Sequence, residues 1–399
     1  MRKALYALLL CATGAGAQEF HLPTSISEAA ALEKDFLLPI GGFYDAPALT
    51  GKPGDLLRTE VFTGYDLPKD VTATRILYHS ADATGHDVAS SAVVLTPTKA
   101  APKGGWPVIV WTHGTSGVAR ACAPSAMKNV YYGGELAKMV DAGFAVLAVD
   151  YHGLGTKGPH QYMDTLAQGQ DVVNALPAAH KAVASLGRKW AVDGHSQGGQ
   201  AAWGIAELEA VRHDPGYLGA ISVAGATHLP WSVQHQDSLE GAGFYLAWVG
   251  YAIHARFPDF KPETMLSERA MADYQAVTEQ GCWFTGFGAY SGVGAKEMVK
   301  PGWEKDPSAQ AFFDEIAVGR KPAAGPILVI AGEADQSVPL DGIKDSVAHG
   351  CALGQKIGFH SYPGLDHEPV MEASLDEQIA WMRDRFAGKP AQSDCGGAK

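Results

Sequence analysis

The segment Trp190–Leu208 constrains the fold of this chain more than any other stretch. It indicates the end of a short strand at Trp190–Asp193, a tight turn over Gly194–Gly199, and a helix from Gln200 onward. The turn contains the pattern G-x-S-x-G. Its glycines allow a sharp turn and close packing of the helix. The pattern therefore predicts a serine held on a strained elbow, with its hydroxyl exposed above a helix N-terminus, where partial positive charge favours an anion.

A glycine-rich turn that contains serine by accident is the alternative, so Ser196 needs a carboxylate and a histidine as partners. The apolar run Pro326–Ala331 predicts a buried parallel strand, and Asp335 lies in the loop just past it. Residues 356–362 predict the last strand, and His367 lies in the turn that follows. Open α/β sheets build their sites beyond the carboxyl ends of their strands, so the three side chains are expected to converge.

Nearby residues of the same types are weaker candidates. Glu333 stands only one step past the strand that precedes Asp335. His360 falls inside the last predicted strand, and His349 falls at the end of the preceding helix. We expect both of these histidines to be structural.

The predicted roles follow from chemistry. A serine hydroxyl is a poor nucleophile at neutral pH, so a neutral imidazole must take its proton while a carboxylate orients that imidazole. The negative charge of a tetrahedral intermediate needs donors, and the backbone N–H of Gln197 is the first candidate. The second is expected in the loop after the strand Val108–Thr112, with Thr115 ahead of Gly114. An ordinary glycine turn is the alternative there.

The order of predicted elements favours an α/β fold, with a mostly parallel central sheet flanked by helices. A stretch without a good strand, residues 228–324, is predicted to be a helical cap inserted between the core segments 18–227 and 325–399. It is rich in aromatic residues, which at helical spacing more often form a small domain's core. Because the insertion falls between the strand after the helix of Ser196 and the strand before Asp335, we expect it to lie over the site and line an apolar acyl pocket. The predicted strands span residues 74–79, 90–96, 107–112, 144–149, 189–193, 219–225, 326–331 and 356–362.

The first 17 residues resemble a secretory signal peptide. Arg2 and Lys3 precede an apolar stretch, and Ala15-Gly16-Ala17 resembles a cleavage site, so Gln18 would start the mature chain. That stretch is too short to span a bilayer, and no other apolar run is long enough. We expect a soluble protein that is secreted or periplasmic.

Charge and cysteine content narrow the function classes. The chain has 31 basic and 43 acidic residues, a net charge of −12, which is a poor match to nucleic acid or anionic membranes. Losing Arg2 and Lys3 with the signal would leave 29 basic residues and a charge of −14. Even cysteine numbers suggest disulfides in exported proteins. Of the three pairings open to the four cysteines outside the signal, we favour Cys122–Cys282 and Cys351–Cys395.

No cofactor or metal is expected. Gly153–Gly158 matches the dinucleotide-binding pattern G-x-G-x-x-G after a strand. However, Asp150 precedes the glycines, no acid ends a strand about twenty residues later, and Pro159 intervenes before any helix. Neither a zinc-protease motif nor a calcium loop is present.

With these residues in hand, the chain resembles the secretory lipase family of α/β-hydrolases. The resemblance covers most of the mature chain and implies hydrolysis of carboxylic esters, often acylglycerols, with a helical cap over the site. It also implies triad roles for Ser196, Asp335 and His367. The matching segments are Pro53–Arg58, Tyr78–Ser80 with Gly85, His113–Thr115, Cys122–Ser125, Asp150–Gly155, Gly194–Gly199, Gly332–Pro339, Cys351–Gly354 and the His367 turn.

We therefore predict an exported serine hydrolase, a triacylglycerol lipase or a carboxylesterase, that works through an acyl-enzyme. Its substrate would be a small ester or an acylglycerol, and its cap is a candidate for contact with a lipid interface. A serine peptidase or amidase on the same fold is the alternative, because a triad does not discriminate between them. A catalytically silent binding protein is a third, less favoured alternative, since such proteins usually lack one triad residue.

Overall fold

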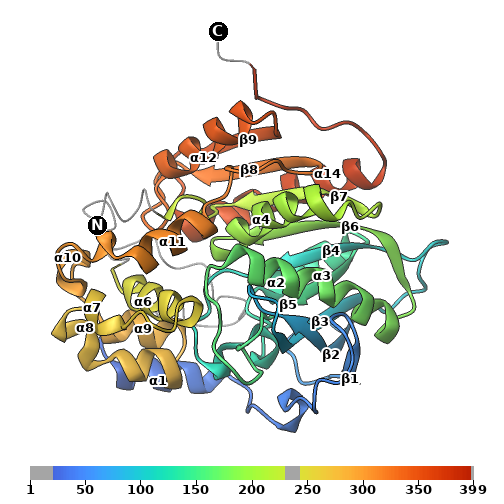
Figure 1. The fold of residues 1–399 in the computed structure, drawn as a ribbon. Helices are drawn as coiled ribbons and strands as arrows, with labels where there is room; N and C mark the ends of the chain where they lie inside the picture. The colour runs from blue at the N-terminus through green and yellow to red at the C-terminus, as the bar shows by residue number, and fades with distance from the viewer. Residues whose placement is uncertain (1–20, 230–242, 397–399) are drawn as a thin grey trace.

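The computed structural model describes residues 21–229 and 243–396, and its centre is a nine-stranded sheet (Figure 1). The strands follow the order β1-β2-β3-β5-β4-β6-β7-β8-β9. Their bounds are β1 Leu56–Val61, β2 Val71–Ala81, β3 Asp87–Pro97, β4 Trp106–Thr112, β5 Ala145–Val149, β6 Leu186–His195, β7 Tyr217–Val223, β8 Pro326–Gly332 and β9 Lys356–Tyr362.

The sheet is parallel from β5 through β9 and antiparallel at its other edge, where β1, β2, β3 and β5 pair. This arrangement confirms the predicted α/β fold. All eight predicted strands are present, with ends shifted by a few residues, and the edge strand β1 is an addition to them. In the parallel part, the carboxyl ends of β4, β6, β8 and β9 lie along one edge of the sheet, which is where the predicted site residues follow.

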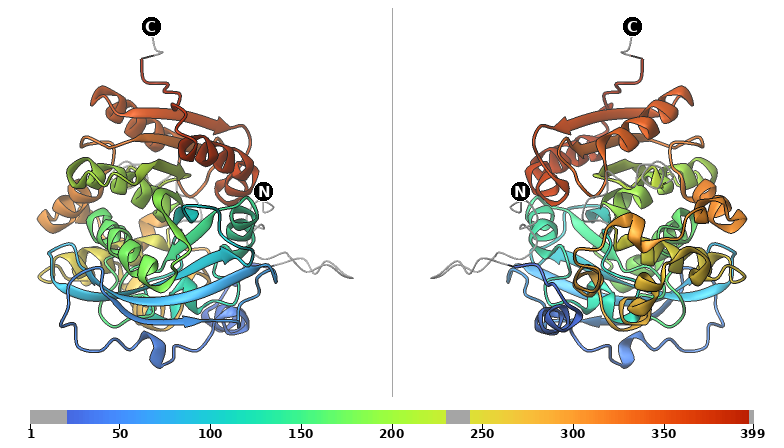
Figure 2. Two further views of the ribbon diagram at one scale, coloured as in Figure 1. Left: turned by 90° about the vertical axis from the view of Figure 1, so that its right-hand side faces the viewer. Right: turned by 90° about the vertical axis from the view of Figure 1, so that its left-hand side faces the viewer.

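Helices cover both faces of the sheet (Figure 2). One face packs against α3, α4 and α12, whose buried side chains join one core cluster with the sheet. The other face packs against α2, α13 and α14 in a second cluster. The bounds of these helices are α2 Gly133–Asp141, α3 Thr165–Ala182, α4 Gln197–Arg212, α12 Leu340–Ala352, α13 His367–Ala373 and α14 Leu375–Phe386.

A third core cluster is formed mostly by the segment 228–324, which is helical in its described part, together with Val118, Tyr162 and Met163. The N-terminal helix α1 (Ile26–Phe36) packs on it through α9, and the two lie side by side in Figure 1. Its helices are α6 Tyr245–Arg256, α7 Pro262–Met265, α8 Glu268–Ala272, α9 Trp283–Ala289, α10 Ala295–Met298 and α11 Pro307–Ile316, with a π-helical turn η5 Ala276–Gln280 and a 3-10 turn η6 Trp303–Lys305. The remaining 3-10 turns are η1 Gly42–Tyr44, η2 Arg120–Cys122 and η3 Pro124–Ala126.

Two disulfides are present, with the pairing favoured from the sequence. Cys122–Cys282 joins the chain just after β4 to the start of α9, and Cys351–Cys395 joins α12 to the C-terminal tail. Among the described residues, no helix combines the length and apolar character needed to cross a bilayer. The predicted signal peptide and its cleavage after Ala17 lie outside the described residues.

Candidate active site

Ser196 occupies the tight turn between β6 and α4. Its φ of 57° lies in the left-handed region, which a non-glycine residue adopts only under strain. The neighbouring glycines are needed because a Cβ on Gly198 would overlap the carbonyl of Thr112, and one on Gly199 would press on the backbone of Gly225. Since α4 begins at Gln197, Ser196 sits directly at a helix N-terminus.

Asp335 and His367 form a buried pair beyond the ends of β8 and β9. Asp335 Oδ1 accepts hydrogen bonds from the backbone N–H groups of Ser337 and Val338, which orient the carboxylate. Its Oδ2 lies 2.8 Å from His367 Nδ1. Burial alone would lower the pKa of His367, but the Asp335 carboxylate, with further contributions from Glu368 and Asp366, raises that pKa to about 9. His367 was expected in a loop; instead it is the first residue of α13, just after the turn.

Ser196 lies close to this pair through its neighbour His195. The rings of His195 and His367 are 4.6 Å apart between centroids, and His195 Nε2 lies 3.1 Å from the His367 carbonyl oxygen. Within residues 21–229 and 243–396, no hydrogen bond joins the Ser196 hydroxyl to His367. Such contacts are often long in unliganded enzymes and tighten only with substrate.

The rival residues have other partners. Glu333 is exposed and accepts a hydrogen bond from the Ser361 hydroxyl. His360 bonds to Glu377 on α14, and His349 bonds to its own helix through the Asp345 carbonyl.

The loop after β4 approaches the elbow. A Cβ placed on Gly114 would lie 3.3 Å from the Cβ of Ser196, so Gly114 lies directly beside the predicted nucleophile. The Gly114 carbonyl contacts His113 Nδ1 at 2.6 Å. Thr115 is held twice: its hydroxyl bonds to Tyr162 at 2.8 Å, and its carbonyl accepts from the Tyr131 hydroxyl at 2.7 Å.

The Gln197 side chain is also anchored, away from the loop. Its amide nitrogen lies 3.3 Å from His160 Nε2, while the ring of His160 bonds through Nδ1 to the His152 carbonyl. The backbone N–H of His160 donates to the hydroxyl of Tyr251 on α6. The helical insertion is therefore connected to the residue that follows Ser196.

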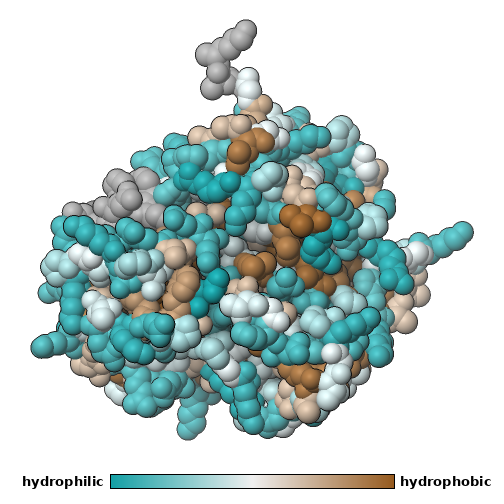
Figure 3. All heavy atoms as spheres, in the orientation of Figure 1, coloured by the Kyte–Doolittle hydropathy of each residue, from teal (hydrophilic) through white to brown (hydrophobic). Residues whose placement is uncertain are grey.

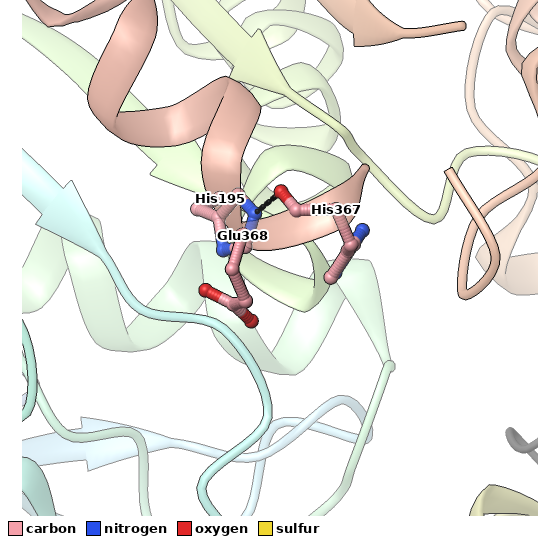
Figure 4. Close-up of side chains that lie close together, drawn as sticks. All are labelled: His195, His367 and Glu368. Atoms are coloured by element: carbon pink, nitrogen blue, oxygen red, sulfur yellow. Dashed lines mark hydrogen bonds between the residues drawn. The ribbon is translucent and has the colours of Figure 1, made fainter. Parts of the chain in front are cut away.

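Glu368 is a titratable neighbour that the motif search did not single out. It lies beside His195 and His367 (Figure 4), and one ligand atom of each residue falls within 4.8 Å of the others. Burial raises the pKa of Glu368 to about 7, and the charge on His367 opposes that shift. The cluster is poorly suited to a metal ion, because both ring nitrogens of His195 and Nδ1 of His367 already have hydrogen-bond partners.

Comparison with known proteins gives the family. Residues 132–394, more than half of the chain, match the family described as secretory lipase. Lipase 4 of Candida albicans is 25% identical over 393 residues, which cover 88% of this chain and 82% of that protein. A protein of Mycobacterium tuberculosis named as a probable inactive lipase is 23% identical over 382 residues, covering 89% and 82%.

The fold has a solved counterpart in lipase A of Candida antarctica. That structure superposes with a TM-score of 0.72 at 17% identity and covers 90% of this chain and 89% of its own. The likeness supports the α/β-hydrolase fold, while the family match carries the assignment. The chain belongs to the secretory lipase family of α/β-hydrolases and is a carboxylic ester hydrolase.

Proposed function

We propose that Ser196, His367 and Asp335 carry out ester hydrolysis through an acyl-enzyme. His367 Nε2 takes the proton of the Ser196 hydroxyl as Oγ attacks the ester carbonyl, and it returns that proton to the departing alcohol. A water molecule then repeats the sequence and releases the acid. Asp335 holds the imidazole through Nδ1 and stabilises its protonated form. The observation that carries the proposal is the 2.8 Å contact between Asp335 and His367 beside the strained elbow.

The oxyanion of the tetrahedral intermediate would be stabilised by two backbone N–H donors. The N–H of Gln197 lies at the first turn of α4, where helix amides have no partner within the helix. The second donor is proposed in the Gly114–Thr115 loop, with Thr115 ahead of Gly114, and the closeness of Gly114 to Ser196 supports this loop as its source.

The substitution Ser196→Ala tests the mechanism. It should abolish hydrolysis of nitrophenyl esters and labelling by a phosphonate probe while the protein stays folded. Ser185→Ala, a change just before the far end of β6, is the matched control and should keep both activities. Retained hydrolysis in Ser196→Ala would refute the assignment. Equal or faster cleavage of peptide anilides by the wild type would favour a peptidase instead.

The helical insertion is proposed as a cap that selects the substrate. It reaches the site: the backbone N–H of Trp283 donates to the Ser116 carbonyl, and the Trp283 indole donates to the hydroxyl of Tyr245. Around these two residues lie Phe244, Trp248 and Phe287. This group of aromatic side chains next to Ser116 supports an ester with an apolar acyl group as the substrate.

A series of nitrophenyl esters of increasing chain length, followed by an emulsified triglyceride, separates an esterase from a true lipase. A sharp fall in kcat/KM beyond short acyl groups would identify an esterase. Sustained activity on the emulsion would support contact of the cap with a lipid interface. Hydrophilic residues cover most of the face seen in Figure 3, and the hydrophobic ones lie in separate groups.

Export is proposed to follow cleavage after Ala17. The family and the two disulfides support an exported protein. N-terminal sequencing of the exported protein should begin at Gln18, and an intact Met1 terminus would contradict the proposal.

A further inference from the structure

Two adjacent tyrosines precede helix α2 in a strained stretch of backbone. Val130 and Tyr131 have φ values of 52° and 64°, although neither is glycine. Left-handed conformations are unfavourable for residues other than glycine and persist only where the surroundings enforce them. The Asn129 side chain accepts a hydrogen bond from the Tyr131 N–H and helps to hold the turn. The turn places the two phenol groups of Tyr131 and Tyr132 next to the candidate active site.

Tyr132 is buried, and its hydroxyl is linked to His367 through the side chain of His195. Its hydroxyl lies 3.0 Å from His195 Nδ1, and His195 Nε2 lies 3.1 Å from the backbone carbonyl of His367. The dashed line of Figure 4 marks this second contact. The ring of His195 therefore bridges the Tyr132 hydroxyl and the backbone of His367.

The proton positions in this chain of contacts can be assigned. Burial lowers the pKa of His195 well below its ordinary value, and the charge on His367 lowers it further, so His195 is neutral. A neutral imidazole has one donor and one acceptor nitrogen, and a carbonyl oxygen can only accept. Nε2–H of His195 therefore donates to the His367 carbonyl, and Nδ1 accepts from the Tyr132 hydroxyl.

The same pair of tyrosines also contacts the Gly114–Thr115 loop, which is proposed to supply an oxyanion donor and is called the oxyanion loop below. The Tyr131 hydroxyl donates to the Thr115 carbonyl, and the Tyr132 hydroxyl lies so close to Gly114 that a Cβ there would approach it to 2.5 Å. Tyr131 and Tyr132 thus contact the oxyanion loop and, through His195, the backbone of His367.

We propose that Tyr132 and His195 are positioning residues that fix the catalytic base relative to the nucleophile. His195 precedes Ser196 in the chain and holds the His367 backbone, so one side chain sets the spacing between the two reacting groups. A displacement of about 1 Å in such a site can cost on the order of 10²-fold in rate. This inference rests on the proposed function, since it assigns the partners of the same Ser196–His367 pair.

Three substitutions separate positioning from mere packing. His195→Phe keeps a ring but removes both hydrogen bonds, whereas His195→Gln supplies an amide oxygen for Tyr132 and an amide N–H for His367. Tyr132→Phe removes only the donor to His195. Tyr362→Phe, which removes a hydroxyl that donates to Glu377 on α14, is the matched control.

Two measurements are made on each variant. The first gives kcat and KM for hydrolysis of nitrophenyl butyrate, and the second gives the rate at which the phosphonate labels Ser196. We expect His195→Phe to lose about 10²-fold in kcat and labelling rate with little change in KM. His195→Gln should recover most of this loss, and Tyr132→Phe should lose about tenfold. The control should match the wild type.

Equal losses in His195→Phe and His195→Gln, or unchanged kcat in a folded His195→Phe, would overturn the proposal. If His195→Phe does not fold, unchanged kcat in Tyr132→Phe would overturn it as well. Failure of the proposed function would look different: the wild type itself would neither hydrolyse the ester nor react with the phosphonate.

Discussion

Glu368 is the residue whose charge should tune His367, the proposed catalytic base. His367 must be neutral to accept the Ser196 proton, yet its pKa is raised to about 9, chiefly by Asp335, with Glu368 adding to the effect. The kcat/KM of the wild type should therefore rise as the pH approaches 9, because that profile reports the free enzyme. Glu368→Gln removes a negative charge, so the acid limb should move to lower pH, by a fraction of a unit to about one unit.

The pH profile of kcat/KM on a soluble nitrophenyl ester measures this shift. Glu372→Gln makes the same charge change on the exposed side of α13 and should leave the limb in place. An acid limb that stays fixed or moves to higher pH in Glu368→Gln would contradict the prediction.

At the scale of single residues, the places of Ser196, Asp335 and His367 just past strands could be predicted, because each follows a recognisable strand, while their catalytic roles stay a prediction. The strain at Val130 and Tyr131 was not predictable, since neither residue type favours positive φ and only tertiary contacts impose it. Glu368 was also missed. A glutamate after a turn resembles any surface residue until the fold places it beside two histidines.

At the scale of elements, helix α1 belongs with the helical insertion by its packing. Glu33 of α1 is buried, and its carboxylate accepts hydrogen bonds from the backbone N–H groups of Cys282 and Thr285 and from the Thr285 hydroxyl. These amides lie at the start of α9, where the N-cap residue Cys282 makes no side-chain capping bond of its own. The side chain of Glu33 thus caps a helix whose N-cap residue, Cys282, lies 249 residues later in the chain.

Glu33→Ala should destabilise the insertion by about 3 kcal/mol, because it leaves several buried donors without partners. The measurement is hydrogen exchange over 283–289 together with the midpoint of chemical unfolding. Asp35→Ala, an exposed change on the same helix, should affect neither. Unchanged protection of the α9 amides in Glu33→Ala would show that this cap is unimportant.

Among the elements, eight strands were predictable, and those inside the parallel part, such as β4, β5 and β8, form continuous apolar runs that are almost fully buried. Strand β1 was missed because Leu56–Val61 is half-buried to exposed and includes Arg58 and Glu60. Its identity as a strand comes from pairing with β2, a contact that its own residues do not indicate. The packing of α1 on α9 was not predictable either, because the residues of α1 alone do not indicate which element it contacts.

At the scale of the whole molecule, the fold class was predictable from the alternation of strands and helices, while the connections between core and insertion were not. The segment 228–324 contacts the site through hydrogen bonds to Ser116 and His160, which depend on the tertiary arrangement. Sequence could propose that the cap covers the site, because the insertion lies between the strand after the helix of Ser196 and the strand that precedes Asp335. The individual contacts between the insertion and the core could be identified only in the structure.

The two disulfides should differ in what they stabilise. Cys122–Cys282 spans 160 residues and Cys351–Cys395 spans 44, so the chain-entropy relation gives about 5 and about 4 kcal/mol of stabilisation. Only the first also braces the site: the Cys122 carbonyl accepts from the Ser116 hydroxyl, and Trp283 beside Cys282 donates to the Ser116 carbonyl. Replacing Cys122 and Cys282 by serine should therefore lower both stability and kcat.

The Cys351→Ser, Cys395→Ser variant is the matched control, since it removes one disulfide far from the oxyanion loop. It should lose stability in urea unfolding but keep the kcat of the wild type on a soluble ester at 25 °C. Because both variants lose one disulfide and gain two serines, any difference in kcat between them reports the contact of Cys122–Cys282 with the site. A full loss of kcat in the tail variant, or an unchanged kcat in the other, would show that Cys122–Cys282 does not hold the loop that faces Ser196.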